Sequence, residues 1–252
     1  MILLPVFGIL IGFISGFFGI GGGTVLVPIM LALGYDIKEA IGISILQMVL
    51  SATFGSFINY KSSNFILKDG FIVGLGGFLG ASLSGFVVSN VQERVLEWGL
   101  LIILAISISK FFYVNTSATP KNPPKSILFI VGFFTGVIAI SMGAGGGILL
   151  TPILVGFLGM DIKKSVYISL FFVLFSSISG FVSLAFHDLI NYKAGLLIAV
   201  GSLIGVYFGT KTSHKIDKQA QKWWLVALYI SMFGLMVKKI FFLNLEIRTK
   251  NE

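Results

Sequence analysis

Six stretches of this chain are apolar over lengths close to the roughly 20 residues that a helix needs to cross a bilayer. They cover residues 40–58, 70–88, 96–113, 166–185, 194–209 and 223–237. Only 11% of the residues are charged, against about 25% in an ordinary soluble domain. The N-terminal run MILLPVFGILIGF lacks the basic segment and cleavage site of a signal peptide, so we interpret it as mature structure. The sequence predicts an all-α, polytopic protein, integral to a bacterial or archaeal cell membrane.

The chain repeats itself. The segment DIKEAIGIS at Asp36 matches DIKKSVYIS at Asp161, an offset of 125 residues. Upstream, GFISG at Gly12 matches GFFTG at Gly132 at an offset of 120, so a short insertion separates the two matches. We therefore expect a first transmembrane repeat over 1–113, a linker rich in Pro, Ser, Thr and Lys over 114–125, a second repeat over 126–243 and a C-terminal tail over 244–252.

Each repeat consists of a glycine-interrupted apolar segment followed by three predicted spans. The piece after the first interruption, 24–33, would be about 15 Å long as a helix, which is half a bilayer. We therefore expect a re-entrant helix pair that does not cross, which leaves three crossings per repeat and inverts the second repeat. Lys and Arg divide 11 against 7 between the two sides in this arrangement, and 10 against 8 if the pair crosses, so the positive-inside rule favours inversion slightly.

The two interruptions are the segments GIGGGTVLVPIM at Gly19 and GAGGGILLTPIL at Gly143. Irregular backbone at membrane depth is tolerated only where it is buried in protein or lines a cavity. Glycines ahead of a helix expose backbone amides at its positive N-terminal end, which favours an anion, and transporters bind substrates at such broken helices. The predicted substrate-binding backbone comprises Gly21, Gly22, Gly23 and Thr24 together with Gly145, Gly146, Gly147 and Ile148. The alternative is that these glycines only permit close helix packing.

Two further patterns accompany the glycines. Pro28 and Pro152 each lie five residues past a triplet, and each should kink the short helix that follows. The next span in each repeat carries polar residues on one helical face: Ser44, Gln47 and Ser51 in the first, Ser169 and Ser176 in the second. These side chains either complete the hydrogen-bond shell of an oxyanion or join neighbouring helices. Gln47 has Phe172 as its repeat mate, which would make a shared site asymmetric.

Other classes of site are disfavoured. The chain has no cysteine and only two histidines, and its ten acidic residues all lie at or near predicted helix ends and loops. We therefore predict no metal, no cofactor and no catalytic residue, and hence no enzyme. The net charge of +8 is dispersed over short loops and the tail, which indicates contact with the lipid bilayer rather than with nucleic acid.

The motif GFxSGxxGxGGG, with a proline five residues past the last glycine, occurs in the first repeat from Gly12 to Pro28. In this motif the chain resembles the TauE/SafE sulfite exporter family of anion permeases, over nearly its whole length. The second copy, Gly132 to Pro152, departs from the motif by the insertion AISM and by Ala144. The resemblance implies transport of a small anion such as sulfite, a sulfonate or sulfoacetate.

Together these patterns predict a secondary transporter with alternating access. Its small anionic substrate would bind at two glycine-rich helix N-termini near the midplane, where backbone dipoles replace fixed charge. The candidate coupling ions are the proton and sodium. The rival interpretations are a non-transporting scaffold or partner subunit and an anion channel.

Overall fold

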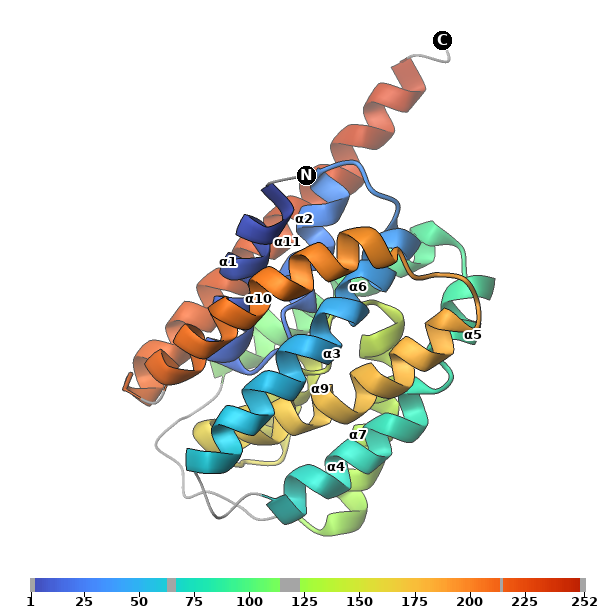
Figure 1. The fold of residues 1–252 in the computed structure, drawn as a ribbon. Helices are drawn as coiled ribbons and strands as arrows, with labels where there is room; N and C mark the ends of the chain where they lie inside the picture. Colours follow the sequence, from blue (N-terminus) through green and yellow to red (C-terminus); the bar gives the residue numbers. More distant parts are fainter. Residues whose placement is uncertain (1–2, 63–66, 114–122, 214, 250–252) are drawn as a thin grey trace.

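The computed structural model describes residues 3–62, 67–113, 123–213 and 215–249, and the regular structure within them is helical (Figure 1). The first half holds α1 (Leu3–Phe18), α2 (Gly23–Ala32), α3 (Ile37–Ser62), α4 (Leu67–Ala81), α5 (Ser84–Asn90) and α6 (Glu93–Tyr113). The second half holds α7 (Lys125–Ser141), α8 (Gly147–Pro152), the π-helical turn η1 (Ile153–Phe157), α9 (Ile162–Ala185), α10 (Tyr192–Ser213) and α11 (Lys218–Thr249).

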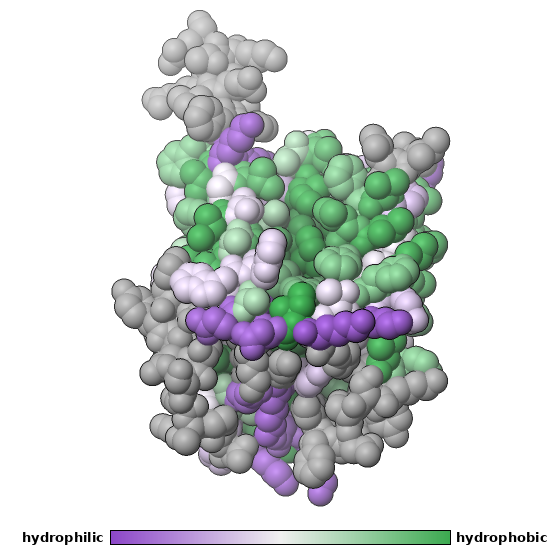
Figure 2. Space-filling view, turned by 90° about the vertical axis from the view of Figure 1, so that its left-hand side faces the viewer, coloured by the Kyte–Doolittle hydropathy of each residue, from purple (hydrophilic) through white to green (hydrophobic). Residues whose placement is uncertain are grey.

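Five helical segments in the described residues are long and apolar enough to cross a membrane: Ile37–Ile58, Lys68–Asn90, Lys164–Ala185, Tyr192–Ser213 and Gln219–Phe241. They contain five of the six predicted spans. The sixth, 96–113, is helical within α6 but is not among these five. On the face shown in Figure 2, hydrophobic residues cover a wide area above a band of hydrophilic ones. The prediction of an all-α, polytopic membrane protein is therefore confirmed.

Both glycine-rich segments break a helix where the sequence predicts a break. α1 ends at Phe18 and α2 begins at Gly23, while α7 ends at Ser141 and α8 begins at Gly147. The inserted residues AISM lengthen α7 beyond its GFFTG motif by about one turn, because a turn takes 3.6 residues. Both halves thus present a broken helix pair followed by longer helices.

One predicted span is less regular than its repeat mate. Residues 70–88 are divided between α4 and α5 by a turn at Ser82 and Leu83, whereas α10, the corresponding helix of the second half, is continuous. The Ser82 hydroxyl donates to the Leu79 carbonyl, 2.7 Å away, and so offers the backbone a local alternative to the helix.

The two halves are interleaved. The first helix of each half packs against a helix of the other half: α1 packs along α10, and α7 packs along α4. These contacts are backbone to backbone: a Cβ added to Gly12 would lie 2.1 Å from the Ser202 carbonyl oxygen, and one added to Gly132 would lie 2.3 Å from the Val73 oxygen. Small residues at helix interfaces in membranes permit this close approach.

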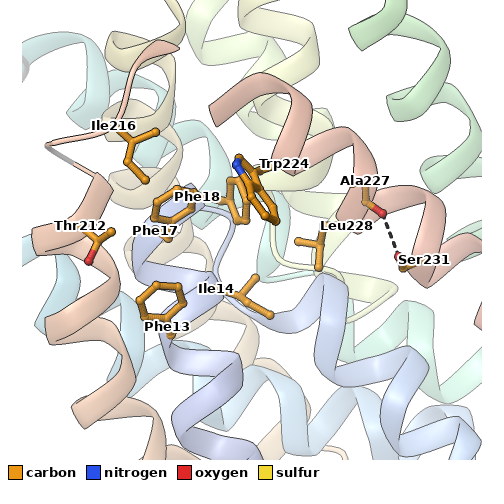
Figure 3. Close-up of a pocket in the computed structure, with 10 residues that line it drawn as sticks. All are labelled: Phe13, Ile14, Phe17, Phe18, Thr212, Ile216, Trp224, Ala227, Leu228 and Ser231. Atoms are coloured by element: carbon orange, nitrogen blue, oxygen red, sulfur yellow. Dashed lines mark hydrogen bonds between the residues drawn. The ribbon is translucent and has the colours of Figure 1, made fainter. Parts of the chain in front are cut away.

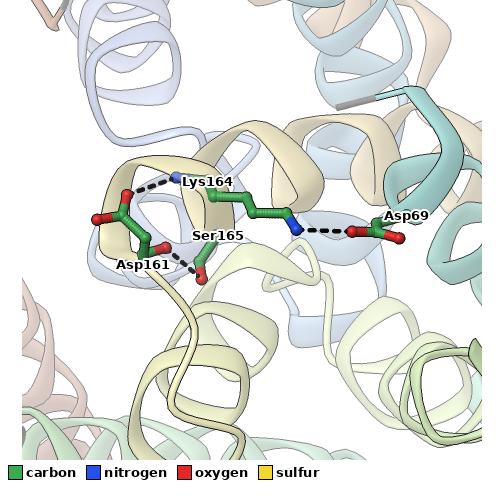
Figure 4. Close-up of polar contacts among 4 residues, drawn as sticks. All are labelled: Asp69, Asp161, Lys164 and Ser165. Atoms are coloured by element: carbon green, nitrogen blue, oxygen red, sulfur yellow. Dashed lines mark hydrogen bonds and ion pairs between the residues drawn. The ribbon is translucent and has the colours of Figure 1, made fainter. Parts of the chain in front are cut away.

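The repeat mates α3 and α9 lie in contact at the centre of the bundle and run in opposite directions (Figure 1). Gly42, near the start of α3, lies against the Leu189 carbonyl that follows the end of α9. At the other end, Lys164 in the first turn of α9 pairs with Asp69 in α4, with 2.7 Å between Nζ and Oδ2 (Figure 4). Both the start and the end of α9 are therefore held by contacts with the first half of the chain.

Candidate functional site

The two glycine turns lie against each other, and we call residues 19–24 and 143–148 together the glycine crossing. The Thr24 hydroxyl donates to the Ala144 carbonyl, and the Ser44 hydroxyl donates to the Gly143 carbonyl, each at 2.7 Å and each fully buried. These bonds join α2 and α3 of the first half to the turn of the second half.

Glycine is required in the crossing for two separate reasons. Gly21 and Gly22 have φ angles of +84° and +74°, and Gly145 has +67°, values that residues with a Cβ rarely adopt. The two turns also approach too closely for side chains, since a Cβ on Gly147 would lie 2.3 Å from the Ile20 Cα. Close packing and an unusual backbone therefore coexist here.

The N-terminus of α2 carries backbone donors without acceptors. The amides of Val25 and Leu26 both donate to the Gly22 carbonyl, at 3.1 and 3.0 Å. Within the described part of the chain, the amides of the four preceding residues, Gly21 to Thr24, have no acceptor in the protein. The first amides of a helix need an external partner, and the dipole of α2 adds positive potential at the same place.

The Gln47 side chain lies directly over this terminus. It is 0% exposed, and neither its Oε1 nor its Nε2 has a hydrogen-bond partner among the described residues. A Cβ placed on Gly22 would lie 2.8 Å from Oε1 and 3.1 Å from Nε2. Leaving a buried polar group unsatisfied costs about 1–3 kcal/mol, and here both ends of one amide are unsatisfied.

The second turn is not equivalent to the first. Gly146, the mate of Gly22, has a helical φ of −54°. The space beside it is filled by Phe172, the mate of Gln47, whose ring would lie 1.5 Å from a Cβ on Gly146. The asymmetry predicted from the Gln47 and Phe172 pair is thus present at the crossing, with a polar group on one side and an aromatic ring on the other.

The predicted hydroxyls are buried and have partners within the protein. Besides Ser44, described above, Ser51 donates to the Met48 carbonyl at 3.3 Å and Ser176 donates to the Phe172 carbonyl at 2.7 Å. The hydroxyls of Ser169 and Thr151 lie 2.9 Å apart. Gln47 is therefore the one predicted side chain in the described structure whose donors and acceptor are all unpaired.

Three further side chains, from the helices that flank the crossing, were not predicted. The Met48 sulfur lies between the two turns, within 3.0 Å of a Cβ position on Gly23 and 2.6 Å of one on Gly145. Ser15 and Ser141, in the last turns of α1 and α7, are buried with hydroxyls that have no partner in the described structure. A single serine or methionine in an apolar helix gives no pattern that would distinguish it from a packing residue.

The two prolines behave differently. Pro28 lies inside α2, which continues as an α-helix to Ala32. Pro152 ends α8, and the chain continues as η1, a π-helical turn. A proline removes one backbone hydrogen bond, and a π-turn is one way in which a helix absorbs this defect. An irregular turn thus follows Pro152, whereas the helix around Pro28 stays α-helical.

No fixed charge is buried at the crossing. The buried polar side chains of the described residues are serines, threonines and glutamines, together with the hydroxyl group of Tyr229. The ion pairs lie away from the crossing: Lys164 and Asp69 are in the first turns of α9 and α4, and Lys239 of α11 pairs with Glu97 near the start of α6. The electrostatic potential at the crossing therefore comes from backbone and amide dipoles.

Comparison with known proteins assigns this architecture to a family. A sequence profile described as "Sulfite exporter TauE/SafE" matches residues 4–236. The chain belongs to the TauE/SafE family. The match includes both glycine turns and α3 with Gln47, so the crossing lies within the part of the chain that defines the membership.

Several TauE/SafE relatives are named as transporters. The chain is 27% identical to the "Probable membrane transporter protein YdhB" of Bacillus subtilis, over 88% of this chain and 93% of the relative. It is 25% identical to a probable membrane transporter protein of the archaeon Methanocaldococcus jannaschii, over 93% and 92%. A probable membrane transporter protein of Haemophilus influenzae is 24% identical over 90% and 92%. No solved structure matches the chain significantly.

Proposed function

We propose that this protein is a permease for a small anion of the sulfur oxyanion or organosulfonate class, such as sulfite or sulfoacetate. The anion binds at the glycine crossing, near the middle of the membrane. The observation that carries this proposal is the Gln47 amide, which is buried and unpaired above the free amides of Gly21 to Thr24. A ligand with several acceptor oxygens would satisfy these donors together.

The chemistry of the crossing favours an anion over a cation. Backbone amides and the N-terminus of α2 offer positive potential, and no carboxylate is among the buried side chains described. Dipoles hold an anion less firmly than a buried lysine or arginine would, and they avoid the cost of a fixed charge in the membrane. Weak holding suits a carrier, which must release its substrate.

The close packing of the crossing favours a small substrate. Thr24 and Ser44 tie the two turns together through hydrogen bonds of 2.7 Å, and the Met48 sulfur fills space between the turns. An anion of a few heavy atoms fits such a setting better than a large metabolite. Because relatives are named as membrane transporters, transport rather than enzymatic chemistry is the proposed activity.

The proposed mechanism is alternating access by two inverted repeats. The opposite directions of α3 and α9 support inversion (Figure 1). A second support is a pair of contacts at opposite ends of these helices: Asn191 donates to Glu39 at 2.6 Å, and Lys164 pairs with Asp69. Glu39 and Lys164 occupy the same position in the two repeats, so equivalent residues make the contacts at the two opposite ends of the α3 and α9 pair.

Reporter fusions test the inversion. A reporter in the linker 114–125, most of which lies outside the described residues, and a reporter after residue 252 should be found on opposite sides of the membrane. Detection of both reporters on the same side would rule out inverted repeats and leave the anion site unaffected.

A thermal-shift screen of the purified protein tests the site. We expect stabilisation by one or more of sulfite, thiosulfate, sulfoacetate and taurine, and less by chloride or acetate. A ligand at 100 times its dissociation constant stabilises by about 2.7 kcal/mol. Gln47→Leu should abolish the shift and the flux of the same anion into proteoliposomes. If Gln47→Leu binds the anion as well as the unsubstituted protein does, the proposed site is refuted. If the reconstituted protein shows a fast single-channel current, it is an anion channel and not a carrier.

A further inference from the structure

Ser15, the serine of the GFISG motif near the end of α1, has a buried hydroxyl without a partner. The residue is 0% exposed, and its Oγ makes no hydrogen bond within the described structure. Other serines in these helices donate to a carbonyl of their own helix, as Ser107 does to Ile103 at 2.8 Å and Ser202 to Ala199 at 2.7 Å. Serine in a helix often bonds in this way. Ser15 does not, so its hydroxyl remains available to a ligand.

The path of the chain places Ser15 beside the first glycine turn. Gly22 immediately precedes α2, yet a Cβ on it would lie 3.1 Å from the Ile11 Cγ2, about two helical turns before α1 ends. The backbone of residues 19–22 therefore returns along the last two turns of α1. Ser15 follows Ile11 by one turn on the same helical face, so it faces the returning backbone.

The other faces of α1 are engaged elsewhere. Gly12 and Gly16 lie against α10. A further face lines an apolar groove of about 480 Å³ between α1, the end of α10 and the start of α11 (Figure 3), with Phe13, Ile14, Phe17 and Phe18. Ser15 is not among the residues that line this groove. The remaining face, with Ile11 and Ser15, is the one that meets the glycine turn.

Ser15 and Gln47 share these surroundings. The Cβ position on Gly22 that lies 3.1 Å from Ile11 lies 2.8 Å from the Gln47 Oε1. Both polar side chains are 0% exposed, and neither has a hydrogen-bond partner among the described residues. They come from α1 and α3, while the free amides of residues 21–24 belong to the start of α2. Three elements thus bring unpaired donors to the first glycine turn.

We propose that the Ser15 hydroxyl is a further ligand of the anion and selects a pyramidal SO₃ group over a carboxylate. This inference rests on the proposed function. The acceptor directions of a carboxylate lie near one plane, whereas the three oxygens of a sulfonate or of sulfite point in three directions from the sulfur. An SO₃ group can therefore accept from Ser15, Gln47 and the amides of α2 together. A carboxylate leaves one of these donors unpaired.

Methanesulfonate and acetate test this selection, because each joins one methyl group to its anionic head. Their dissociation constants are measured on the purified full-length protein by calorimetry. The unsubstituted protein should bind methanesulfonate more tightly than acetate. Ser15→Ala should weaken methanesulfonate binding by roughly ten- to hundred-fold, the effect of losing a hydrogen bond to a charged group, and should change acetate binding much less. The unfolding temperature of ligand-free Ser15→Ala should not fall, because the hydroxyl bonds to no described part of the protein.

Two further variants separate this inference from the proposed function. Ser177→Ala removes another buried hydroxyl, which donates to the Leu174 carbonyl at 3.2 Å, and should keep the preference for methanesulfonate. Gln47→Leu should lose methanesulfonate binding. If Gln47→Leu loses it but Ser15→Ala keeps the full preference, the role of Ser15 is overturned and the anion site stands.

Three other outcomes would also overturn the role of Ser15. The first is an unsubstituted protein without preference for methanesulfonate over acetate. The second is a lower unfolding temperature of ligand-free Ser15→Ala, because the hydroxyl would then have a partner in the protein. The third is an unsubstituted protein that binds no anion at all, in which case the proposed function fails as well.

Discussion

The ring of Phe172 lies against Gly146 in the second half of the chain, at the place where the Gln47 amide lies against Gly22 in the first. The two pairs are related by the internal repeat, yet one closes its turn with an apolar ring and the other leaves an unpaired amide. The crossing therefore has one polar side and one apolar side.

This relationship predicts an unusual effect of Gln47→Leu. Removal of a buried, unsatisfied amide should raise the free energy of unfolding by about 1 kcal/mol, while anion binding is lost. Gln221 is the matched control, because it is also buried but donates to the Phe17 carbonyl at 3.0 Å and to the Ser213 hydroxyl at 3.1 Å. Gln221→Leu should lower stability by about 1–3 kcal/mol. Thermal unfolding of both variants in the same detergent measures the difference, and similar destabilisation of both would contradict a ligand role for Gln47.

Thr24→Val and Ser44→Ala should each destabilise the protein by about 1–3 kcal/mol, because each leaves a buried carbonyl without its donor. Those carbonyls belong to Ala144 and Gly143, so each substitution removes one hydrogen bond that joins the first half of the chain to the second glycine turn. Ser231→Ala, which removes an exposed hydroxyl bonded within its own helix, should change stability by less than about 0.5 kcal/mol. Chemical denaturation provides the comparison, and a neutral Thr24→Val would show that the turns are held together by packing alone.

Glycine substitutions should affect stability more where α1 packs against α10 than in α11. Gly12→Ala places a methyl group 2.1 Å from the Ser202 carbonyl oxygen, so α1 and α10 must move apart and stability should fall by more than about 2 kcal/mol. Gly234 in α11 has no atom within 4 Å of its Cβ position among the described residues. Gly234→Ala should therefore be neutral, or stabilise by up to about 1 kcal/mol through helix propensity. Melting temperatures of the two purified variants would decide, and an unaffected Gly12→Ala would contradict the close approach of α1 and α10.

The two ion pairs should differ in their response to salt. Lys164 and Asp69 have side chains 28% and 29% exposed, whereas Lys239 and Glu97 are 16% and 15% exposed. Asp69→Asn should cost less than about 1 kcal/mol, and the cost should shrink further in 1 M salt. Glu97→Gln should cost more and respond less to salt, because its partner is left in a drier environment. Unfolding at low and high salt distinguishes the pairs, and an equal response of both would show that burial does not control them.

The breaks in the helices could be predicted because glycine clusters act locally. Consecutive residues such as Gly21 and Gly22 allow left-handed backbone, and the structure uses that freedom. Five spans could be predicted for a similar reason, since apolar length is a property of the segment alone. The coarse architecture is therefore encoded in short stretches of sequence.

Other features depend on contacts that no short stretch encodes. Gly146 follows the same motif as Gly22 but has a helical backbone, and the Phe172 ring, contributed by another helix, fills the space beside it. The hydroxyls of Ser51 and Ser176 bond to carbonyls of their own helix, an outcome that spacing on a helical face does not distinguish from ligand binding. Pairing of α1 with α10 joins residues almost 200 positions apart, and the repeat alone does not reveal it.

The interleaving of the halves has a consequence for how the chain folds as it is made. α1 is synthesised well before α10, the helix that its glycine surface packs against. Residues with bare backbone at that surface therefore remain without their partner until α10 has been added, and the first half cannot complete its packing on its own.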